Sequence, residues 1–225
     1  MLFYREEQMN FELARFNMVE QQTRPWGVTD LEVRQLLMTV RREDYVPPAM
    51  QALAFADIEI PLPGGQVMLR PSVEGRILQA IGTSHVGSVL EIGTGSGYFA
   101  ALLAANADHV YTVEIDPELV QLARNNLARN GVNNVTVEEG DASLGWYTKA
   151  PYDVIVVSGG LPELPEELLM QLKPSGQLFA FTGTPPTMKA CIISRNDKKA
   201  FLNRPLFETV VSMLRHIPQV PAFNF

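Results

Sequence analysis

Apolar and polar residues follow two different patterns in the earlier and later parts of the chain. In the earlier part, apolar residues recur every three or four positions, which is typical of helices with one buried face. This pattern predicts a helix over residues 11–22, a second from the capping-box sequence at 29–32 to the prolines at 47 and 48, and a third over 72–81. Residues 57–71 are rich in Pro and Gly and predict a loop with short extended pieces.

From residue 88 onward, short apolar runs alternate with stretches of helical pattern. The runs are continuous rather than alternating in and out, which indicates parallel strands covered by helices on both faces. Asp116 and Pro117 predict the start of one helix, and Gly131 predicts its end. The other elements expected are strands at 88–92, 109–113, 135–137, 152–157, 177–181, 190–194 and 209–214, and helices at 98–105 and 162–172.

The same patterns predict how the chain is organised. Residues 1–80 would form an N-terminal lobe with a substrate-side loop, and residues 81–225 would form the core. A chain of 225 residues can bury one sizeable core, or one core with a small appended lobe. The fold class expected is therefore α/β, with a mostly parallel sheet.

Composition and charge exclude several classes of protein. Hydrophobic residues make up 46% of the chain, which is too much for a largely disordered protein. The formal net charge of −7 argues against a nucleic-acid partner, which would need a basic face. No run of about 18 apolar residues occurs, so we expect no membrane partner. The single cysteine, Cys191, cannot form an internal disulfide, which fits a reducing cytoplasmic location.

The strongest chemical signal is the glycine-rich turn Gly93-Thr94-Gly95-Ser96-Gly97, which follows an expected strand and opens an expected helix. Glycines there let the backbone approach a ligand closely. Glu114, 21 positions after Gly93 at the next strand end, can accept hydrogen bonds from a ribose diol. Asp141, after the third strand, can accept one from the amine of adenine. Each alone is more simply explained as a turn or surface residue, but together they predict a nucleoside site.

These motifs resemble those of the protein-L-isoaspartate O-methyltransferase family. The similarity runs from about Met18 to Gly183 and includes EIGTGSGYFAALLA, VYTVEIDPELVQLAR and NVTVEEGDASLGW, while IPLPGGQ is similar to the family's substrate-side loop. The resemblance implies a Rossmann-like S-adenosylmethionine methyltransferase fold, with a mostly parallel twisted sheet, helices on both faces and an N-terminal helical lobe. It also implies S-adenosyl-L-methionine as the cofactor, and methyl esterification of the carboxylate of isoaspartyl residues in damaged proteins.

The resemblance implies roles for particular residues as well. The three glycines of the turn would line the methionine and ribose part of the cofactor, and Glu114 would bind the ribose hydroxyls. Asp141 with Ala142 would hold the adenine, and Ser158 would face the reacting groups. The full set of cofactor-binding residues expected is Glu91, Ile92, Gly93, Thr94, Gly95, Ser96, Gly97, Tyr98, Glu114, Ile115, Asp141, Ala142 and Ser158.

The substrate-side loop departs from the family pattern. The family reads Gly-Gln-Thr-Ile-Ser, then a polar residue and Pro, whereas residues 65–71 read Gly-Gln-Val-Met-Leu-Arg-Pro. Val67 and Leu69 thus stand where hydroxyl donors are expected. Either Arg70 captures the acceptor carboxylate, or an apolar pocket floor takes a different small-molecule acceptor, or the cofactor is bound without isoaspartyl activity. The substrate residues expected are Gln66, Val67, Met68, Leu69 and Arg70.

Methylation of a carboxylate requires no general base. With a pKa near 4, about 99.9% of the acceptor is already ionised at pH 7. The work left to an enzyme is to position and desolvate it. The three histidines are scattered and no metal-ligand spacing occurs, so the sequence assigns no catalytic residue and no metal.

Two other classes of enzyme are disfavoured by motifs. Methyltransferases that act on the amines of nucleic-acid bases generally carry an Asn/Asp-Pro-Pro-aromatic motif, where residues 158–162 read Ser-Gly-Gly-Leu-Pro. A dinucleotide-dependent dehydrogenase would have a third small residue where Tyr98 stands.

Overall fold

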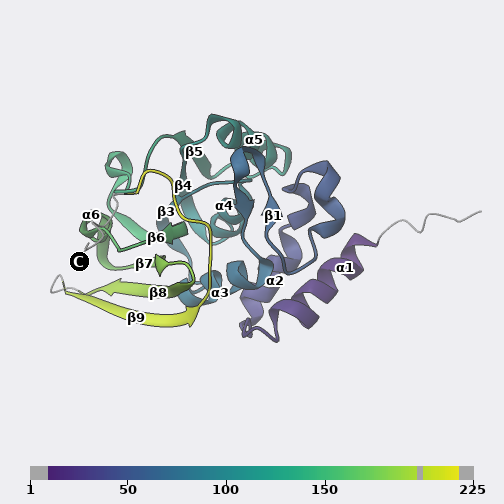
Figure 1. Cartoon of the computed structure of the whole chain (residues 1–225), viewed down its shortest axis with the longest axis horizontal. Coiled ribbons are helices and arrows are strands. Elements are labelled where there is room, and N and C mark those ends of the chain that lie inside the picture. Colours follow the sequence, from purple (N-terminus) through teal and green to yellow (C-terminus); the bar gives the residue numbers. More distant parts are fainter. Residues whose placement is uncertain (1–9, 197–199, 218–225) are drawn as a thin grey trace, which may run out of the picture.

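The computed structural model describes residues 10–196 and 200–217. One large sheet contains the strands β3 (Val86–Ile92), β4 (Ala107–Glu114), β5 (Val135–Glu139), β6 (Tyr152–Leu161), β7 (Leu172–Thr184), β8 (Thr187–Arg195) and β9 (Phe201–Glu208). The strand order is β5-β4-β3-β6-β7-β8-β9 (Figure 1). The strands from β5 to β7 are parallel, and β8 and β9 add two antiparallel strands at one edge.

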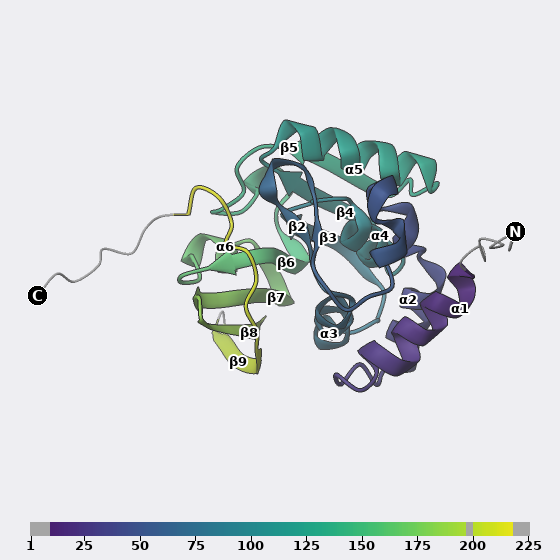
Figure 2. The ribbon, with the colours of Figure 1, turned by 45° about the vertical axis from the view of Figure 1, so that its right-hand side comes forward.

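Helices cover the sheet and extend from it at the N-terminal side. The helices are α1 (Phe11–Asn17), α2 (Leu31–Thr39), α3 (Pro71–Ile81), α4 (Tyr98–Ala104), α5 (Pro117–Arg129) and α6 (Glu166–Met170); α1 continues as a π-helical turn over Met18–Thr23. Short 3₁₀ segments lie at Arg42–Asp44, Pro48–Leu53, Pro63–Gly65 and Tyr147–Lys149. A small ribbon pairs β1 (Ile60–Pro61) with β2 (Val67–Met68). Figures 1 and 2 place α1 and α2 on the side opposite to β8 and β9.

Successive residues of the central strands face two separate cores. Along β6, Val154 and Val156 belong to the core that includes the N-terminal helices, α4 and α5. Ile155 and Val157 belong to the other core, which includes Leu168 of α6. The sheet is thus covered on both faces, which explains why its parallel strands are continuously apolar. The expected fold class is confirmed, whereas the domain boundary at residue 80, which α3 crosses, stays a prediction.

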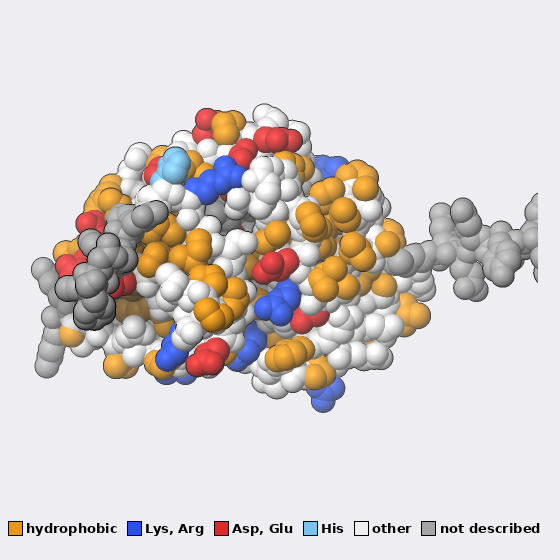
Figure 3. All heavy atoms as spheres, in the orientation of Figure 1, with side chains coloured by type: hydrophobic (Ala, Val, Ile, Leu, Met, Phe, Trp, Pro, Cys, Tyr) orange, Lys and Arg blue, Asp and Glu red, His pale blue; other side chains and the backbone are white. Residues whose placement is uncertain are grey.

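Hydrophobic side chains also gather on the outer surface of the N-terminal elements (Figure 3). The large exposed ones in the described part of this region are Leu13, Phe16, Trp26, Leu31, Leu53 and Ile58.

The N-terminal elements are joined to the site by a buried ion pair. Arg42 is fully buried, and its Nη1 pairs with Glu74 of α3. Its Nη2 donates to the carbonyl of Leu69 at 2.7 Å, and the guanidinium lies 5.1 Å from the ring centre of Tyr98 in α4. Burial raises the pKa of Glu74 to about 7, although the Arg42 charge acts to lower it. The Arg42 side chain therefore fixes α3, α4 and the substrate-side loop relative to one another.

Several expected elements differ at their boundaries. The second helix ends at Thr39 rather than at the prolines 47 and 48, and the chain then turns through the 3₁₀ segment that carries Arg42. Asp30, not Thr29, caps this helix, because its Oδ1 accepts from the N–H of Glu32 at 2.8 Å and of Val33 at 3.1 Å.

Two elements expected after residue 160 are also corrected. The helix at 162–172 shortens to α6, since Pro165 occupies the N-cap and Leu172 opens β7. The strand at 209–214 is wrong: the final strand is β9, and within 209–214 Met213 forms one isolated bridge to Gly160. β9 gives a weak signal because it is largely exposed and contains Pro205.

Arg42→Met should lower the free energy of unfolding by about 3–5 kcal/mol, because it leaves the Glu74 carboxyl buried without its cation. Urea denaturation followed by circular dichroism measures the change. The matched control is Arg24→Met, since Arg24 is 59% exposed and pairs with Glu20 on the surface; it should cost less than about 1 kcal/mol. Equal losses in the two variants would contradict the role given to Arg42.

Candidate functional site

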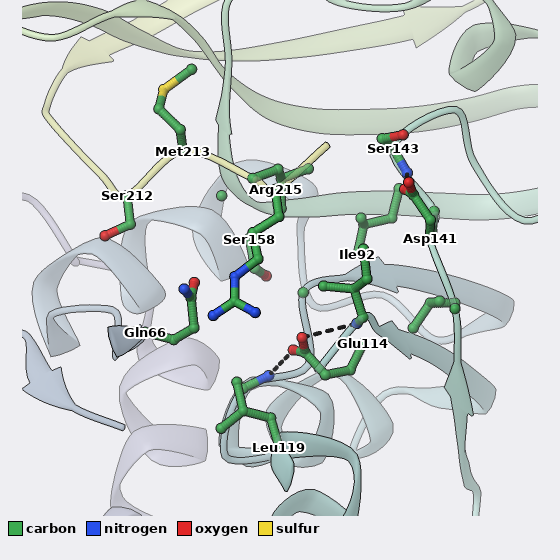
Figure 4. A pocket seen from close by; sticks show the side chains of 18 of the residues that line it. Gln66, Ile92, Glu114, Leu119, Asp141, Ser143, Ser158, Ser212, Met213 and Arg215 are labelled. Carbon is green, nitrogen blue, oxygen red and sulfur yellow. Dashed lines mark hydrogen bonds between the residues drawn. The ribbon is translucent and has the colours of Figure 1, made fainter. Parts of the chain in front are cut away.

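An open cavity lies at the edge of the sheet where the parallel strands β3, β4, β5 and β6 end (Figure 4). Its inner wall is formed by these strand ends and the loops after them, and its outer wall by residues 66–69 and 212–215. The lining residues are Gln66, Val67, Leu69, Ile92, Gly93, Gly95, Val113, Glu114, Ile115, Leu119, Gly140, Asp141, Ala142, Ser143, Ser158, Gly159, Ser212, Met213, Leu214 and Arg215.

The glycine-rich turn between β3 and α4 belongs to the inner wall. Gly93, Gly95 and Gly97 have φ angles of +93°, +54° and +83°, a region that residues with a Cβ rarely adopt. Gly93 and Gly95 line the cavity, whereas a Cβ on Gly97 would lie 3.3 Å from Ala123. Gly97 therefore allows α4 and α5 to pack closely, and the other two glycines leave backbone open to a ligand.

The carboxylate of Glu114 is held at the end of β4 by backbone donors. Its Oε2 accepts from the N–H of Gly95 at 2.9 Å, and its Oε1 accepts from the N–H of Ile115 at 2.9 Å and of Asp116 at 3.1 Å. Figure 4 marks hydrogen bonds of this carboxylate with dashed lines. Three donors give it one orientation against the cavity, where it can accept from a ligand hydroxyl.

The carboxylate of Asp141 lies on the loop after β5. Its Oδ1 accepts from the N–H of Ser143 at 2.9 Å, and its Oδ2 is 3.5 Å from Nδ1 of His216. Partial burial acts to raise the pKa of Asp141, but hydrogen bonds from Ser143 and the nearby His216 outweigh it and lower the pKa below its ordinary value. Asp141 is therefore an ionised acceptor at neutral pH. Its neighbour Gly140 leaves room for the Trp146 ring, which would lie 2.8 Å from a Cβ there.

Glu91 is buried behind the glycine-rich turn. Its Oε2 accepts from Thr112 Oγ1 at 2.6 Å and its Oε1 accepts from Ser158 Oγ at 3.3 Å. Burial raises the pKa of Glu91 to about 8, despite these two hydrogen bonds, which lower it. Glu91 is therefore mostly protonated at neutral pH.

A smaller chamber adjoins the main cavity. The two spaces share Val67, Leu69, Gly93, Gly95 and Ser158 as lining residues. The chamber also contacts Glu91 and the aromatic rings of α4, so it extends the cavity toward the substrate-side loop.

The structure brings most of the sequence-predicted cofactor residues together. Ile92, Gly93, Gly95, Glu114, Ile115, Asp141, Ala142 and Ser158 line the main cavity. Glu91, Thr94, Ser96 and Tyr98 line the adjoining chamber. Gly97 lies outside both, for the packing reason given above. Their roles toward a ligand stay predictions.

The predicted substrate residues are divided among the main cavity, the chamber and a position outside both. Gln66, Val67 and Leu69 line the main cavity, and Met68 lines the chamber. Arg70 lies outside both spaces in the described part of the chain, and its Nη2 donates to Thr209 Oγ1 at 3.3 Å. The hypothesis that Arg70 captures an acceptor carboxylate thus gains no support from its position.

Residues 212–215 line the cavity and were missed by the sequence interpretation. Figure 4 shows Arg215 pointing toward Gln66 and the strand end that carries Glu114. No local pattern marked these residues as part of the site, because their position depends on the return of the chain along β6.

Over residues 10–196 and 200–217, no helix is long and apolar enough to cross a membrane. No group of three His, Cys, Asp or Glu side chains there is arranged to hold a metal ion.

The strand order, the glycine-rich turn and the cavity at the carboxyl strand ends are those of a Rossmann-like fold that binds a ligand at this edge of the sheet. The family model for protein-L-isoaspartate(D-aspartate) O-methyltransferase matches residues 15–212. The chain therefore belongs to this family, as the sequence resemblance indicated.

Individual relatives agree with this placement. The protein-L-isoaspartate O-methyltransferase of Myxococcus xanthus is 42% identical over 157 residues, which is 70% of this chain and 74% of that protein. A solved protein-L-isoaspartate O-methyltransferase matches with a TM-score of 0.76 at 25% identity; the match covers 89% of this chain, and this chain spans 65% of that one. A Plasmodium falciparum protein, solved in complex with S-adenosyl-L-homocysteine, shares the fold with a TM-score of 0.74 at 19% identity, over 92% of this chain and 99% of that one.

Glu91→Gln should make stability less dependent on pH. Glu91 titrates near pH 4.5 when unfolded and near 8 when folded, so its ionisation costs stability as the pH rises between these values. The slope from this group is at most about 1.4 kcal/mol per pH unit, and a neutral glutamine removes it. Urea unfolding at pH 5, 6, 7 and 8 should therefore show that the free energy of unfolding of the variant increases relative to that of the parent as the pH rises. Glu139→Gln, at the exposed end of β5, is the control, and a constant difference for Glu91→Gln would contradict its burial as a neutral acid.

Proposed function

We propose that the protein transfers the methyl group of S-adenosyl-L-methionine to the carboxylate of isoaspartyl residues in damaged polypeptides. The observation that carries this proposal is the cavity at the strand ends, in which backbone amides orient Glu114, in a chain that belongs to this family. A cytoplasmic location is part of the proposal and rests on the buried free thiol of Cys191.

The residues of the cavity fit an adenosyl ligand. An ionised carboxylate has about four acceptor sites, and three are used by the backbone in Glu114, which leaves one on Oε2 among the described contacts. That site suits a ribose hydroxyl. Asp141, kept ionised, suits the adenine amine, and the apolar side chains of Ile115, Leu119 and Ala142 suit the flat base.

The cofactor, when bound, supplies a methyl group on a positively charged sulfur. The protein has to hold a carboxylate acceptor beside that position, and the acceptor is already ionised at neutral pH. Val67, Leu69, Met213 and Leu214 give this part of the cavity apolar walls. These walls exclude water from the acceptor and so strengthen its interaction with the positive sulfur.

A second candidate is methylation of a smaller acceptor by the same cavity. The observation that favours it is that Val67 and Leu69 both line the cavity without a hydroxyl group. The hydroxyl of Ser158, which also lines the cavity, already donates to Glu91, so it does not replace the hydroxyl groups that are absent at residues 67 and 69. The acceptor side is thus where this chain departs most from its family.

Transfer of a tritiated methyl group from S-adenosyl-L-methionine tests the proposal directly. A synthetic peptide with one isoaspartyl residue should become labelled with a base-labile methyl ester, and its normal aspartyl twin should stay unlabelled. A protein that binds the cofactor but labels neither peptide would leave the smaller acceptor as the better candidate.

Glu114→Gln should weaken the binding of S-adenosyl-L-homocysteine by about 10- to 100-fold. This is the loss expected when a hydrogen bond to a charged group, worth about 1.5–3 kcal/mol, is impaired. Titration calorimetry measures it. Glu139→Gln at the end of the neighbouring strand makes the same chemical change outside the cavity and should bind as the parent does. Unchanged affinity in Glu114→Gln would remove this residue from the cofactor site.

A further inference from the structure

Arg215 lies where three segments that are remote in the sequence come together. It belongs to the chain after β9, which returns along the end of β6 through two backbone hydrogen bonds. Gly160 N–H donates to the carbonyl of Ser212 at 2.8 Å, and Leu214 N–H donates to the carbonyl of Gly160 at 2.9 Å. This return brings residues 212–215 over the carboxyl end of the sheet, where they close the outer wall of the cavity (Figure 4).

The guanidinium of Arg215 reaches the other two segments. Its Nη1 pairs with Oδ2 of Asp116 at 3.0 Å, and its Nη2 donates to the carbonyl of Gly64 at 2.6 Å. With the amide oxygen of Gln66 facing the arginine, that oxygen accepts from Nη2 at 3.0 Å and from Nε at 3.2 Å. The planar fork of arginine suits such a set of divergent acceptors, which a single ammonium group could not serve together.

Two neighbouring residues, Gly64 and Asp116, fit the contacts that Arg215 makes. Gly64 has a φ of +66°, which favours glycine, and a Cβ there would lie 2.5 Å from Oδ2 of Asp116 and 3.0 Å from Nη2 of Arg215, so it would displace the ion pair. Asp116 uses its other oxygen, Oδ1, to cap α5 through the N–H of Glu118 at 3.0 Å. Its own N–H donates to Glu114, so the ion pair stands two residues from the carboxylate proposed to bind ribose.

We propose that Arg215 is a positioning residue that clasps the substrate-side loop and the chain after β9 onto the start of α5, and thereby sets the outer wall of the cavity. The clasp consists of Arg215, Asp116, Gly64 and Gln66. The expected effect of the clasp on turnover rests on the proposed function. Its expected effect on the substrate-side loop does not depend on any activity.

The contacts of Arg215 indicate that it positions the cavity wall and does not bind the carboxylate of the acceptor. Arg215 could in principle bind a carboxylate of the substrate, as arginine often does. Here Asp116 already neutralises it, and its Nε and Nη2 hydrogens point to Gly64 and Gln66. Its contribution to transfer is therefore to fix where Val67 and Leu69 stand relative to the strand ends.

The test compares Arg215→Ala with Arg215→Lys and with the control Arg204→Ala on the exposed strand β9. In Arg215→Ala, we expect at least 10-fold faster hydrogen exchange at residues 62–68, with exchange in β3 unchanged. We expect S-adenosyl-L-homocysteine to dissociate at least 5-fold faster, and KM for the isoaspartyl peptide to rise about 10-fold with kcat within 3-fold of the parent. Arg215→Lys should recover part of each change, because lysine can still pair with Asp116.

The outcomes separate this proposal from the proposed function. Loop exchange and dissociation that equal those of Arg204→Ala would overturn the clasp, whatever the turnover. A large fall in kcat with unchanged KM and unchanged exchange would overturn it as well, since that result assigns Arg215 to the reacting groups. Faster exchange in a protein that labels no isoaspartyl peptide would support the clasp and count against the isoaspartyl acceptor.

Asp116→Asn provides a second variant in case Arg215→Ala folds poorly. It keeps the side-chain oxygen that caps α5 and removes the charge that faces Arg215. Exchange at residues 62–68 should quicken by a smaller factor than in Arg215→Ala. The double variant should exchange no faster than Arg215→Ala alone, because the two residues act through one contact. Additive effects would show that they act separately and would overturn the clasp.

Discussion

The buried guanidinium of Arg42 is the interaction on which the placement of the site most depends. It pairs with Glu74, binds the carbonyl of Leu69 and lies over the ring of Tyr98. These partners belong to α3, to the substrate-side loop and to the helix that follows the glycine-rich turn. An ion pair in such a place adds little net stability, because both groups lose their hydration. What it contributes is the relative position of these elements: it fixes α3, the substrate-side loop and α4 against one another beside the cavity.

The two walls of the cavity differ in how they are built. The inner wall rests on paired strands, whose hydrogen-bonded register leaves Glu114, Asp141 and Ser158 little freedom. The outer wall is made of two segments that lie outside the large sheet, one joined to β6 by two backbone hydrogen bonds and both linked to α5 through Arg215. The proposed function places the cofactor against the wall built from paired strands and the acceptor against the wall built from these two segments.

Much of the sheet and of the inner wall could be predicted from the sequence. Parallel strands buried on both faces are continuously apolar, and the carboxyl ends of such strands meet at one edge, so Gly93, Glu114 and Asp141 could be placed together before any coordinates. The capping aspartate and proline at the start of α5 were equally local signals, and they are confirmed.

What could not be predicted depends on contacts between remote segments. β9 is mostly exposed and contains Pro205, so its apolar pattern is weaker than that of the loop at 209–214, which was mistaken for a strand. The position of Arg215 depends on the return of the chain along β6, and that return depends on the small residues Gly159 and Gly160, beside which Leu214 and Met213 pack. The hydrophobic periodicity of a single segment carries no information about a contact between segments that are remote in the sequence. Arg70 shows the converse case: its residue type and its place in the loop suggested a contact with the acceptor, but it is not among the residues that line the two spaces, and its Nη2 donates to Thr209.

The composition of β9 has a consequence for the molecule in a crowded solution. The outermost strand of an open sheet offers its free backbone groups to any other chain, and long apolar edges of this kind nucleate aggregates. β9 ends the sheet with exposed Asn203 and Arg204 and with Pro205, which has no amide hydrogen to donate. The exposed polar residues and Pro205 weaken the apolar pattern of β9, and they also disfavour pairing of another strand with this edge of the sheet.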